Sequence, residues 1–421
     1  MTMRLDRMRA AACAALVATL AACENALDVE SPSRIPAELI ESPANAALLV
    51  RSAVGDFECA FGAYVVMGGI VGDELIEATQ TADRWPYDAR RTQPNDLRYG
   101  TFGCTANGVY TPLQTARVSA ERILGLLQGW TDAEVPNRTR LMATAAAHAG
   151  YALQLLGEGF CSLAVSTINP DRSVSYGGEI SRDSVFRLAE ARFTEAITAA
   201  QASGTTDILN MALVGRARAR LYRGRYAEAR ADAVQVPSTF VKNMTASATS
   251  GRRENRVWSN NSATSTATSV GDLYRTLNDP RVPVTNLNRN SVTGVPLWRQ
   301  DKYPTAGSPI RIASGHEAAL IVAEAEIAAG NLAAADSIIN IYRARGNQSA
   351  ISSPDSATAM SYLIDQRRRE LFLEGQHLGD YIRFQLPFSP AVGAPYHAGG
   401  VYGQQRCFPL PDVERNNNPN L

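Results

Sequence analysis

The feature that most constrains the fold is a pattern of small and aromatic residues that occurs twice in the chain. The first copy covers residues 211–237, and its repeating positions lie on two successive helical faces with a glycine between them: Ala212, Gly215, Ala219, Tyr222, Gly224, Tyr226, Ala229 and Ala233. The second copy, residues 318–346, matches the first at four positions: Ala325, Gly330, Leu332 and Ala335. Small residues at such positions let two antiparallel helices approach closely. The sequence therefore predicts stacked helix pairs.

A third helix pair is predicted upstream of these two copies. Residues 138–157 are apolar almost all round, which is typical of a buried helix, and residues 183–202 carry Phe186, Ala189, Phe193 and Ile197 on one face. The pattern is that of tetratricopeptide units, which we place at about residues 138–202, 207–237 and 316–346. A mainly α fold follows, in which the repeats are interrupted.

A loop-rich insertion is predicted at about residues 243–312, between the two clear copies. Its first part is rich in serine, threonine and asparagine around Trp258, a composition typical of loops. Its second part contains Val295-Pro296-Leu297-Trp298, which favours a small β-hairpin. Residues 360–421 form a C-terminal segment, with a last helix at 360–384 followed by an extended stretch rich in proline and glycine.

The N-terminus has the features of a signal peptide over residues 1–22. Arg4, Arg7 and Arg9 precede an apolar run that is too short to cross a bilayer. The run ends in Leu20-Ala21-Ala22-Cys23, which resembles a bacterial lipobox, so we expect Cys23 to be the lipidated first residue of a mature chain 23–421. A plain secretory signal is the alternative. No later segment is expected to span a membrane.

Export to an oxidising compartment bears on the cysteines. Of six in the chain, Cys59, Cys104, Cys161 and Cys407 remain once Cys13 and Cys23 are assigned to the signal and the lipid. Four cysteines allow three pairings, and we favour Cys59–Cys104 with Cys161–Cys407, because the first closes a local loop and the second ties the C-terminal segment to the helices. Four free buried thiols are the alternative. The spacings match no zinc site.

Composition and motifs exclude several classes of function. The 41 basic and 41 acidic residues leave no net charge, which argues against a nucleic-acid partner. Nucleophile-elbow, phosphate-loop, zinc-protease and calcium-loop motifs are missing, so we predict a protein that is not an enzyme and needs no cofactor or metal. We interpret Glu74 and Glu77 as surface charges and His148 as a core histidine.

The C-terminal third resembles one family of proteins. Residues 308–347 and 365–384 and the final Arg406–Leu421 are together similar to segments of the SusD/RagB family of nutrient-binding outer-membrane lipoproteins. The lipobox, Asp279-Pro280-Arg281 and Lys302-Tyr303 also fit, so the resemblance extends over nearly the whole mature chain as one domain, 23–421. It implies a right-handed superhelical scaffold of tetratricopeptide-like pairs with a loop-rich binding face.

The resemblance implies a function for the chain: binding oligosaccharides at the cell surface and delivering them to a TonB-dependent SusC-like transporter. Aromatic rings beside polar groups suit sugar binding, because sugar rings have apolar faces and polar edges. We therefore expect a ligand site from six residues of the loops: Arg84, Trp85, Tyr87, Asn95, Trp258 and Trp298. The alternatives are a peptide-binding member of the same family and a scaffold lipoprotein.

Overall fold

The computed structural model describes residues 40–421, and residues 46–421 form one compact unit. The predicted signal peptide and the predicted lipid site Cys23 lie outside the described residues. A short 3-10 helix, η1 (Pro43–Asn45), precedes the unit.

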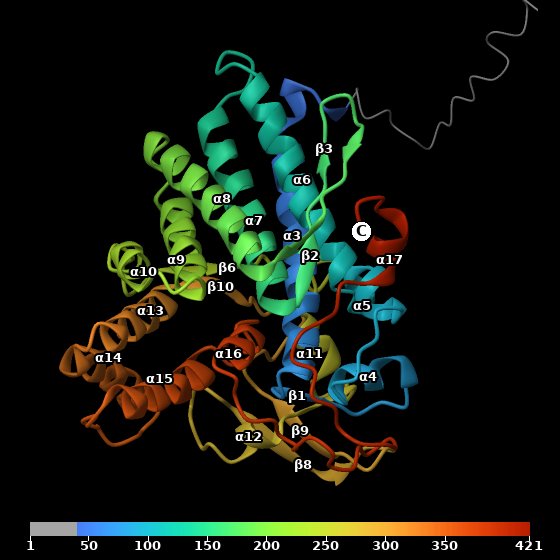
Figure 1. Cartoon of the computed structure of the whole chain (residues 1–421), viewed down its shortest axis with the longest axis vertical. Coiled ribbons are helices and arrows are strands. Elements are labelled where there is room, and N and C mark those ends of the chain that lie inside the picture. The colour runs from blue at the N-terminus through green and yellow to red at the C-terminus, as the bar shows by residue number, and fades with distance from the viewer. Residues whose placement is uncertain (1–39) are drawn as a thin grey trace, which may run out of the picture. The chain divides into compact units, whose positions relative to one another are not determined.

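Helix α3 (Ala46–Val71) is the central element of the unit (Figure 1). Most of its second half is buried, and α6 (Tyr110–Gly129), α7 (Arg138–Gly159) and α11 (Arg256–Asn260) pack against it. By length and composition the stretch Pro43–Val71 could cross a membrane, contrary to our expectation that no such segment follows the signal, but 83% of its most apolar window is buried by the protein itself. The apolarity of α3 is therefore that of a core helix.

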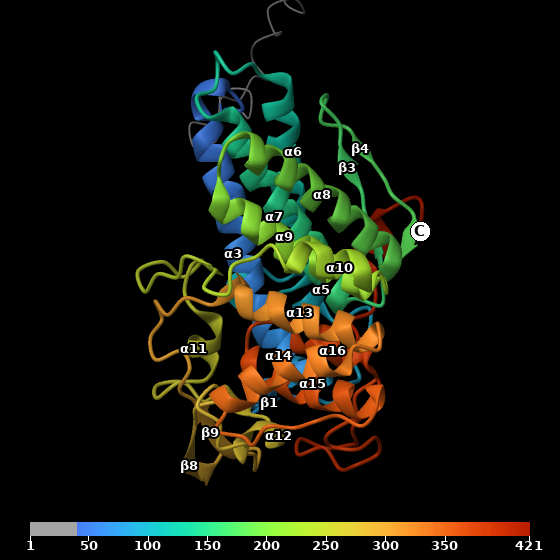
Figure 2. The ribbon, with the colours of Figure 1, turned by 90° about the vertical axis from the view of Figure 1, so that its left-hand side faces the viewer.

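The predicted helix pairs follow one another along one side of the unit (Figure 2). Beyond α7, each helix packs on the next in the order α8 (Arg182–Ala202), α9 (Thr206–Tyr222), α10 (Tyr226–Ala233), α13 (Gly315–Ala328), α14 (Leu332–Arg345) and α15 (Ser356–Glu370). Close approach needs glycine where the Phe193 ring of α8 lies against Gly150 and Gly215, because a Cβ at either position would clash with it. The mainly α fold of tetratricopeptide-like pairs is confirmed.

The loops between the helices form short two-stranded sheets. Antiparallel pairing joins β1 (Leu75–Glu77) to β7 (Thr268–Val270), β8 (Val284–Asn290) to β9 (Pro296–Gln300), β2 (Ser162–Ala164) to β5 (Glu179–Ser181), β3 (Thr167–Ile168) to β4 (Val174–Ser175), and β6 (Val241–Asn243) to β10 (Arg311–Ser314). The β8–β9 hairpin lies within the stretch where the sequence predicts one.

The remaining elements are short: η2 (Ala82–Arg84), α4 (Trp85–Asp88), α5 (Leu97–Thr101), η3 (Cys104–Ala106), α12 (Asp272–Arg275), α16 (His377–Arg383) and α17 (Asp412–Asn417). Beyond α16 the chain runs back along the unit in an extended form, and Phe408 bridges to Phe160. Two disulfides, Cys59–Cys104 and Cys161–Cys407, join the pairs that the sequence favours. The second fastens the extended segment just after the end of α7.

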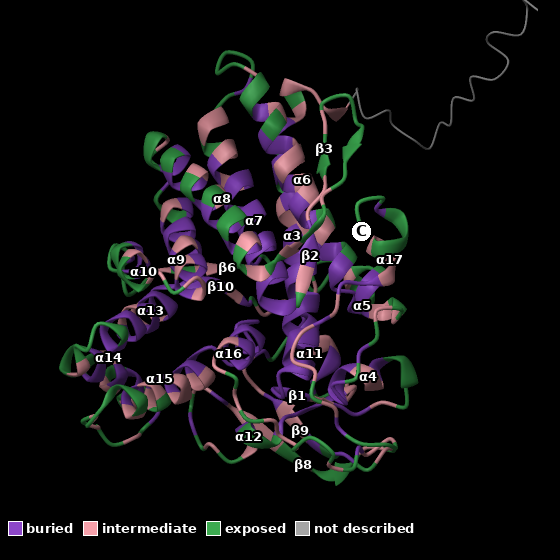
Figure 3. Ribbon diagram, viewed as in Figure 1, coloured by how far each residue is buried: buried purple, intermediate pink, exposed green. Residues whose placement is uncertain are grey.

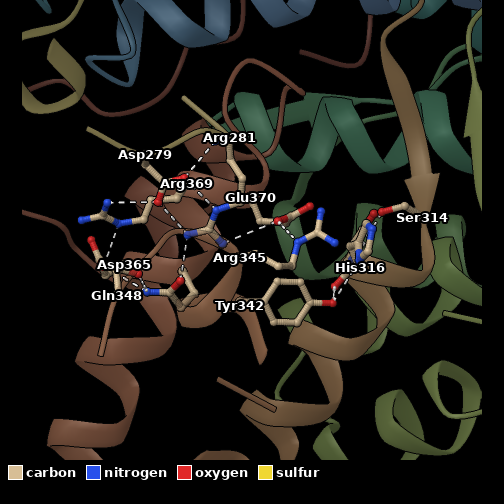
Figure 4. Close-up of polar contacts among 12 residues, drawn as sticks. Asp279, Arg281, Ser314, His316, Tyr342, Arg345, Gln348, Asp365, Arg369 and Glu370 are labelled. Atoms are coloured by element: carbon tan, nitrogen blue, oxygen red, sulfur yellow. Dashed lines mark hydrogen bonds and ion pairs between the residues drawn. The ribbon is translucent and has the colours of Figure 1, made fainter. Parts of the chain in front are cut away.

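The charges on the last helices are paired in the interior, as burial requires. Arg367 donates from Nε to Asp380 Oδ2 at 2.7 Å, and Glu374 Oε1 accepts from Lys302 Nζ at 2.6 Å. Figure 4 shows a neighbouring cluster in which Asp279 of the insertion binds Arg281 and Arg369 at 2.7 and 3.2 Å. The Asp279–Arg369 pair joins α15 to the insertion. Figure 3 shows, in purple, the buried faces of the surrounding helices.

Candidate functional site

The predicted site residues come from segments that meet at one end of the unit. There, α4 and η2 of the N-terminal loop lie near α11, the β1–β7 pair and the β8–β9 hairpin (Figures 1 and 2). The opposite end is formed by the tips of α6, α7 and α8. Five of the six predicted residues are held in this loop-rich end by contacts described below; Asn95 is exposed and has no side-chain bond within it.

Arg84 is buried and has a structural role. Its Nε lies 2.7 Å from Glu77 Oε2, and its Nη1 donates to Asn260 Oδ1 at 3.3 Å. Burial lowers the pKa of Arg84 and the carboxylate of Glu77 opposes that effect, so the pair is an internal ion pair. Arg84 therefore ties the N-terminal loop to α11, and its remaining nitrogen, Nη2, is buried away from any ligand, which corrects its expected role.

Tyr87 is likewise interior, and the expectation that it contacts ligand is corrected. Its ring is fully buried and packs edge-on against Tyr99 and Phe408, with ring centroids 6.2 Å apart in each case. The hydroxyl accepts a hydrogen bond from the Tyr99 backbone N–H at 3.1 Å. No face of the Tyr87 ring is exposed on which a sugar could stack.

Trp85 is half-buried and serves partly as an anchor. Its indole Nε1 donates to the Thr79 carbonyl at 3.0 Å, and the ring packs on a small cluster with Ala89, Tyr396 and Tyr402. The C-terminal segment thus packs against the N-terminal loop through Tyr396 and Tyr402. The rest of the indole remains at the surface.

Trp258 and Trp298 are also half-buried, and α11 connects them. Two asparagines follow Trp258: Asn260 accepts from Arg84, and Asn261 Nδ2 donates to the Trp298 carbonyl at 3.0 Å. The backbone of Trp298 is held from the other side, where its N–H donates to Ser269 Oγ at 2.9 Å. The structure therefore brings Arg84, Trp258 and Trp298 around one short helix, with each tryptophan fixed by its backbone.

One polar partner was missed by reasoning from the sequence. Asn286 of β8 lies opposite Trp298 of β9 in the register of the hairpin, so their side chains share a face of the ribbon. Asn286, Asn288 and Asn290 are all exposed. The alternation Asn286-Leu287-Asn288-Arg289-Asn290 is the signal that could have identified them, since period two is typical of a strand with one polar face. An exposed amide beside a tryptophan can bind the hydroxyl edge of a sugar.

Acidic side chains beneath this surface are structural. Glu74 and Glu77 are both buried, which corrects their interpretation as surface charges; Glu74 Oε1 accepts from the Leu373 N–H at 2.8 Å. His148 is a core histidine, with Nδ1 2.7 Å from the Thr144 carbonyl. Within residues 40–421, no group of three or more His, Cys, Asp or Glu side chains is placed to hold a metal ion.

The sequence and the fold were compared with those of known proteins. The model of the SusD family matches residues 309–421, which hold the last tetratricopeptide-like pair and the C-terminal segment. Solved structures of SusD superfamily proteins superpose on nearly the whole chain. The resemblance to the SusD family is confirmed. No curated protein sequence matches the chain.

The structural matches have low sequence identity. A SusD superfamily protein from Parabacteroides distasonis superposes with a TM-score of 0.70 at 13% identity, over 92% of this chain and 99% of that one. One from Bacteroides vulgatus gives 0.68 at 15%, over 90% and 97%. A laminarin binding SusD-like protein gives 0.66 at 14%, over 90% and 100%. At such identities the likeness establishes the SusD fold.

Proposed function

We propose that the chain is an outer-membrane lipoprotein that binds oligosaccharides at the cell surface and delivers them, chemically unaltered, to a TonB-dependent SusC-like transporter. The observation that carries the binding role is the set of half-exposed tryptophans Trp85, Trp258 and Trp298 at the loop-rich end, with Asn286 beside Trp298. Aromatic faces next to amides form the kind of surface on which sugar rings stack.

The tryptophans are held in place by the protein, which favours a binding site that is formed before the ligand arrives. Arg84, Asn260 and Asn261 fix the backbone around Trp258 and Trp298, and Trp85 is held by Thr79. A side chain held in place before binding loses less conformational freedom when the ligand arrives. The laminarin binding SusD-like protein, which shares the fold, makes a neutral glucan a reasonable first ligand to try.

The binding role is tested by calorimetry with a panel of oligosaccharides and peptides, including laminarin oligosaccharides. Truncation of one stacking ring costs on the order of 1–2 kcal/mol, so Trp258→Ala or Trp298→Ala should each weaken binding about tenfold. Trp130→Ala is the matched control, because Trp130 is a half-buried tryptophan at the end of α6 in the opposite part of the unit. Equal losses in all three variants would contradict the site.

The proposed location and partner need a separate test. The native lipoprotein would be isolated from outer membranes in detergent, and a large β-barrel protein should co-purify with it. Cys23→Ser should abolish membrane association, because the acyl chains would be missing. Isolation without a β-barrel partner would favour the scaffold alternative, and binding of peptides alone would favour the peptide-binding alternative.

A further inference from the structure

A cavity of the structure lies apart from the tryptophan surface. Its volume is about 710 Å³, and it lies between α15, α16, α12 and the segment 386–389 that follows α16. None of the tryptophans lines it. Cavities of roughly 300–1,000 Å³ are the usual size of small-molecule sites in proteins.

Apolar and aromatic side chains form much of the cavity wall. Tyr362 of α15 lines it, together with Leu386 and Phe388 of the segment after α16. The Phe388 ring is fixed edge-on against Tyr381, with centroids 5.8 Å apart, and Arg406 lies across its face. Arg90 also lies over the Phe388 ring, 4.9 Å from its centroid, so Tyr362 and Leu386 are left to contact an apolar face of a ligand.

Two arginines, Arg343 and Arg368, bring positive charge to the cavity wall. Arg343 of α14 lies over the Tyr362 ring at 5.4 Å and donates from Nε to the Ser349 carbonyl, but neither of its terminal nitrogens has a hydrogen bond to a described residue. Arg368 of α15 donates from Nη2 to Asp365 Oδ1 at 2.7 Å, and its Nη1 likewise has no such partner. Both guanidinium groups therefore retain free N–H donors.

The acidic groups of the cavity, Asp73 and Asp365, already have cationic partners. Asp73 accepts from Arg90 Nη1 at 3.0 Å and from the Ser389 N–H at 3.3 Å. Asp365 is shared between Arg368 and Arg369, as part of the cluster in Figure 4. Burial lowers the pKa of His377 to about 4, so its ring carries no charge near neutral pH. Arg368 is thus paired with Asp365, whereas Arg343 has no carboxylate partner among the described residues, which favours an anionic ligand beside Arg343.

We propose that this cavity binds a carboxylate-bearing sugar, such as a uronic acid residue of an acidic oligosaccharide, through Arg343 and Arg368. A guanidinium binds a carboxylate through parallel N–H bonds, and the ring of the sugar would pack against Tyr362 and Leu386. The sugar part of this assignment rests on the proposed function, whereas the preference for a carboxylate rests on the cavity alone.

The test compares digalacturonic acid with its dimethyl ester. The ester keeps both sugar rings but carries neither negative charge. Calorimetry on the processed wild-type chain should give at least about tenfold tighter binding of the acid, as expected for charge-assisted hydrogen bonds. Arg343→Gln should remove most of that difference. Arg187→Gln is the control, because Arg187 is an exposed arginine of α8, outside the cavity and outside the loop-rich end, and its loss should leave the difference unchanged.

Further variants keep the test decisive. Ser361→Trp places a bulky ring at an exposed position of the cavity wall and should weaken acid binding without loss of fold, as checked by circular dichroism. Equal affinity for acid and ester, or equal effects of Arg343→Gln and Arg187→Gln, would overturn the proposal. A tripeptide with a free carboxyl group that binds while digalacturonic acid does not would overturn the ligand class.

Failure of the proposed function has a different signature. Neutral oligosaccharides would then fail to bind, or would bind equally to the wild type and Trp298→Ala. Acid binding that depends on Arg343 would persist in that case, since the cavity shares no tryptophan with the loop-rich end.

Discussion

Arg367 of α15 and Asp380 of α16 form a buried ion pair, with 2.7 Å between Nε and Oδ2 and side-chain exposures of 1% and 6%. Both groups lie in the C-terminal segment that the SusD family model matches. Asp380 also binds Arg383, which reaches Glu324 of α13. The segment is thus a charge network that seats the last helices on the repeats.

Asp380→Asn should destabilise the protein by about 3–5 kcal/mol, because it leaves Arg367 buried without its counter-charge. Urea unfolding followed by circular dichroism would measure the loss. Asp132→Asn is the control: Asp132 pairs with Arg138 at 2.8 Å but is 74% exposed, so its loss should cost less than about 1 kcal/mol. Similar costs for the two variants would contradict the buried network.

Removal of the Cys161–Cys407 disulfide should cost more stability than removal of Cys59–Cys104. The two bonds join residues 246 and 45 positions apart, and in the chain-entropy account the longer loop adds roughly 1–2 kcal/mol. Double alanine variants of each pair, compared by urea unfolding, measure the difference. The reverse order would show that strain or residual structure in the unfolded chain outweighs loop length.

Stability should fall as the pH rises from 6.5 to 8.5, in part because of Glu74. Burial raises the pKa of Glu74 to about 8, well above its ordinary value of 4.5, so the folded chain binds this proton more tightly than the unfolded chain. The contribution of protonated Glu74 to the free energy of unfolding is fully present below about pH 4.5, and it is lost as the pH rises through about 8.

Glu74→Gln should therefore lessen the decline in melting temperature between pH 6.5 and 8.5, by the equivalent of at most about 2 kcal/mol. The buried histidines act in the opposite direction near pH 6.5, because burial lowers the pKa of His148 and that of His377 to about 4 while the unfolded rings still lose protons there. Their contribution is the same in the wild type and in Glu74→Gln, so the difference between the two slopes reports Glu74. Glu134→Gln, an exposed substitution, should keep the wild-type slope. A wild-type slope in Glu74→Gln would contradict a protonated Glu74.

Tyr87→Phe should lower stability by about 0.5–1.5 kcal/mol and leave ligand affinity unchanged. The substitution removes only the hydroxyl that accepts from the Tyr99 N–H, and the ring stays in the core. Thermal unfolding and calorimetry on the same preparation separate the two effects. A clear loss of affinity at unchanged stability would return Tyr87 to the binding site.

The helix pairs could be predicted from sequence because their signal is local. Gly224 and Gly330 take the left-handed conformation that ends a helix, with φ of +70° and +78°, and small residues at fixed spacing mark the contacts between neighbours. The cysteine pairing followed from the export signal and from the place of Cys407 in the final segment.

The site was harder to predict, because burial of a loop residue is decided by distant segments. Tyr87 lies in a polar, aromatic loop that resembles a sugar-binding loop, yet Phe408, more than three hundred residues later, covers its ring. Arg84 is neutralised by Glu77 and bound by Asn260 of the insertion. The cavity lined by Arg343 and Phe388 joins segments that no spacing in the sequence relates.

Binding of oligosaccharide at the loop-rich end can be mapped by hydrogen–deuterium exchange of the chain with and without the bound ligand. We expect slower exchange in the backbone of α11 and the β8–β9 hairpin, which carry Trp258 and Trp298, and no change in α9 and α10 of the repeats. Protection confined to the repeat helices, with α11 and the hairpin unaffected by a ligand shown to bind, would contradict it.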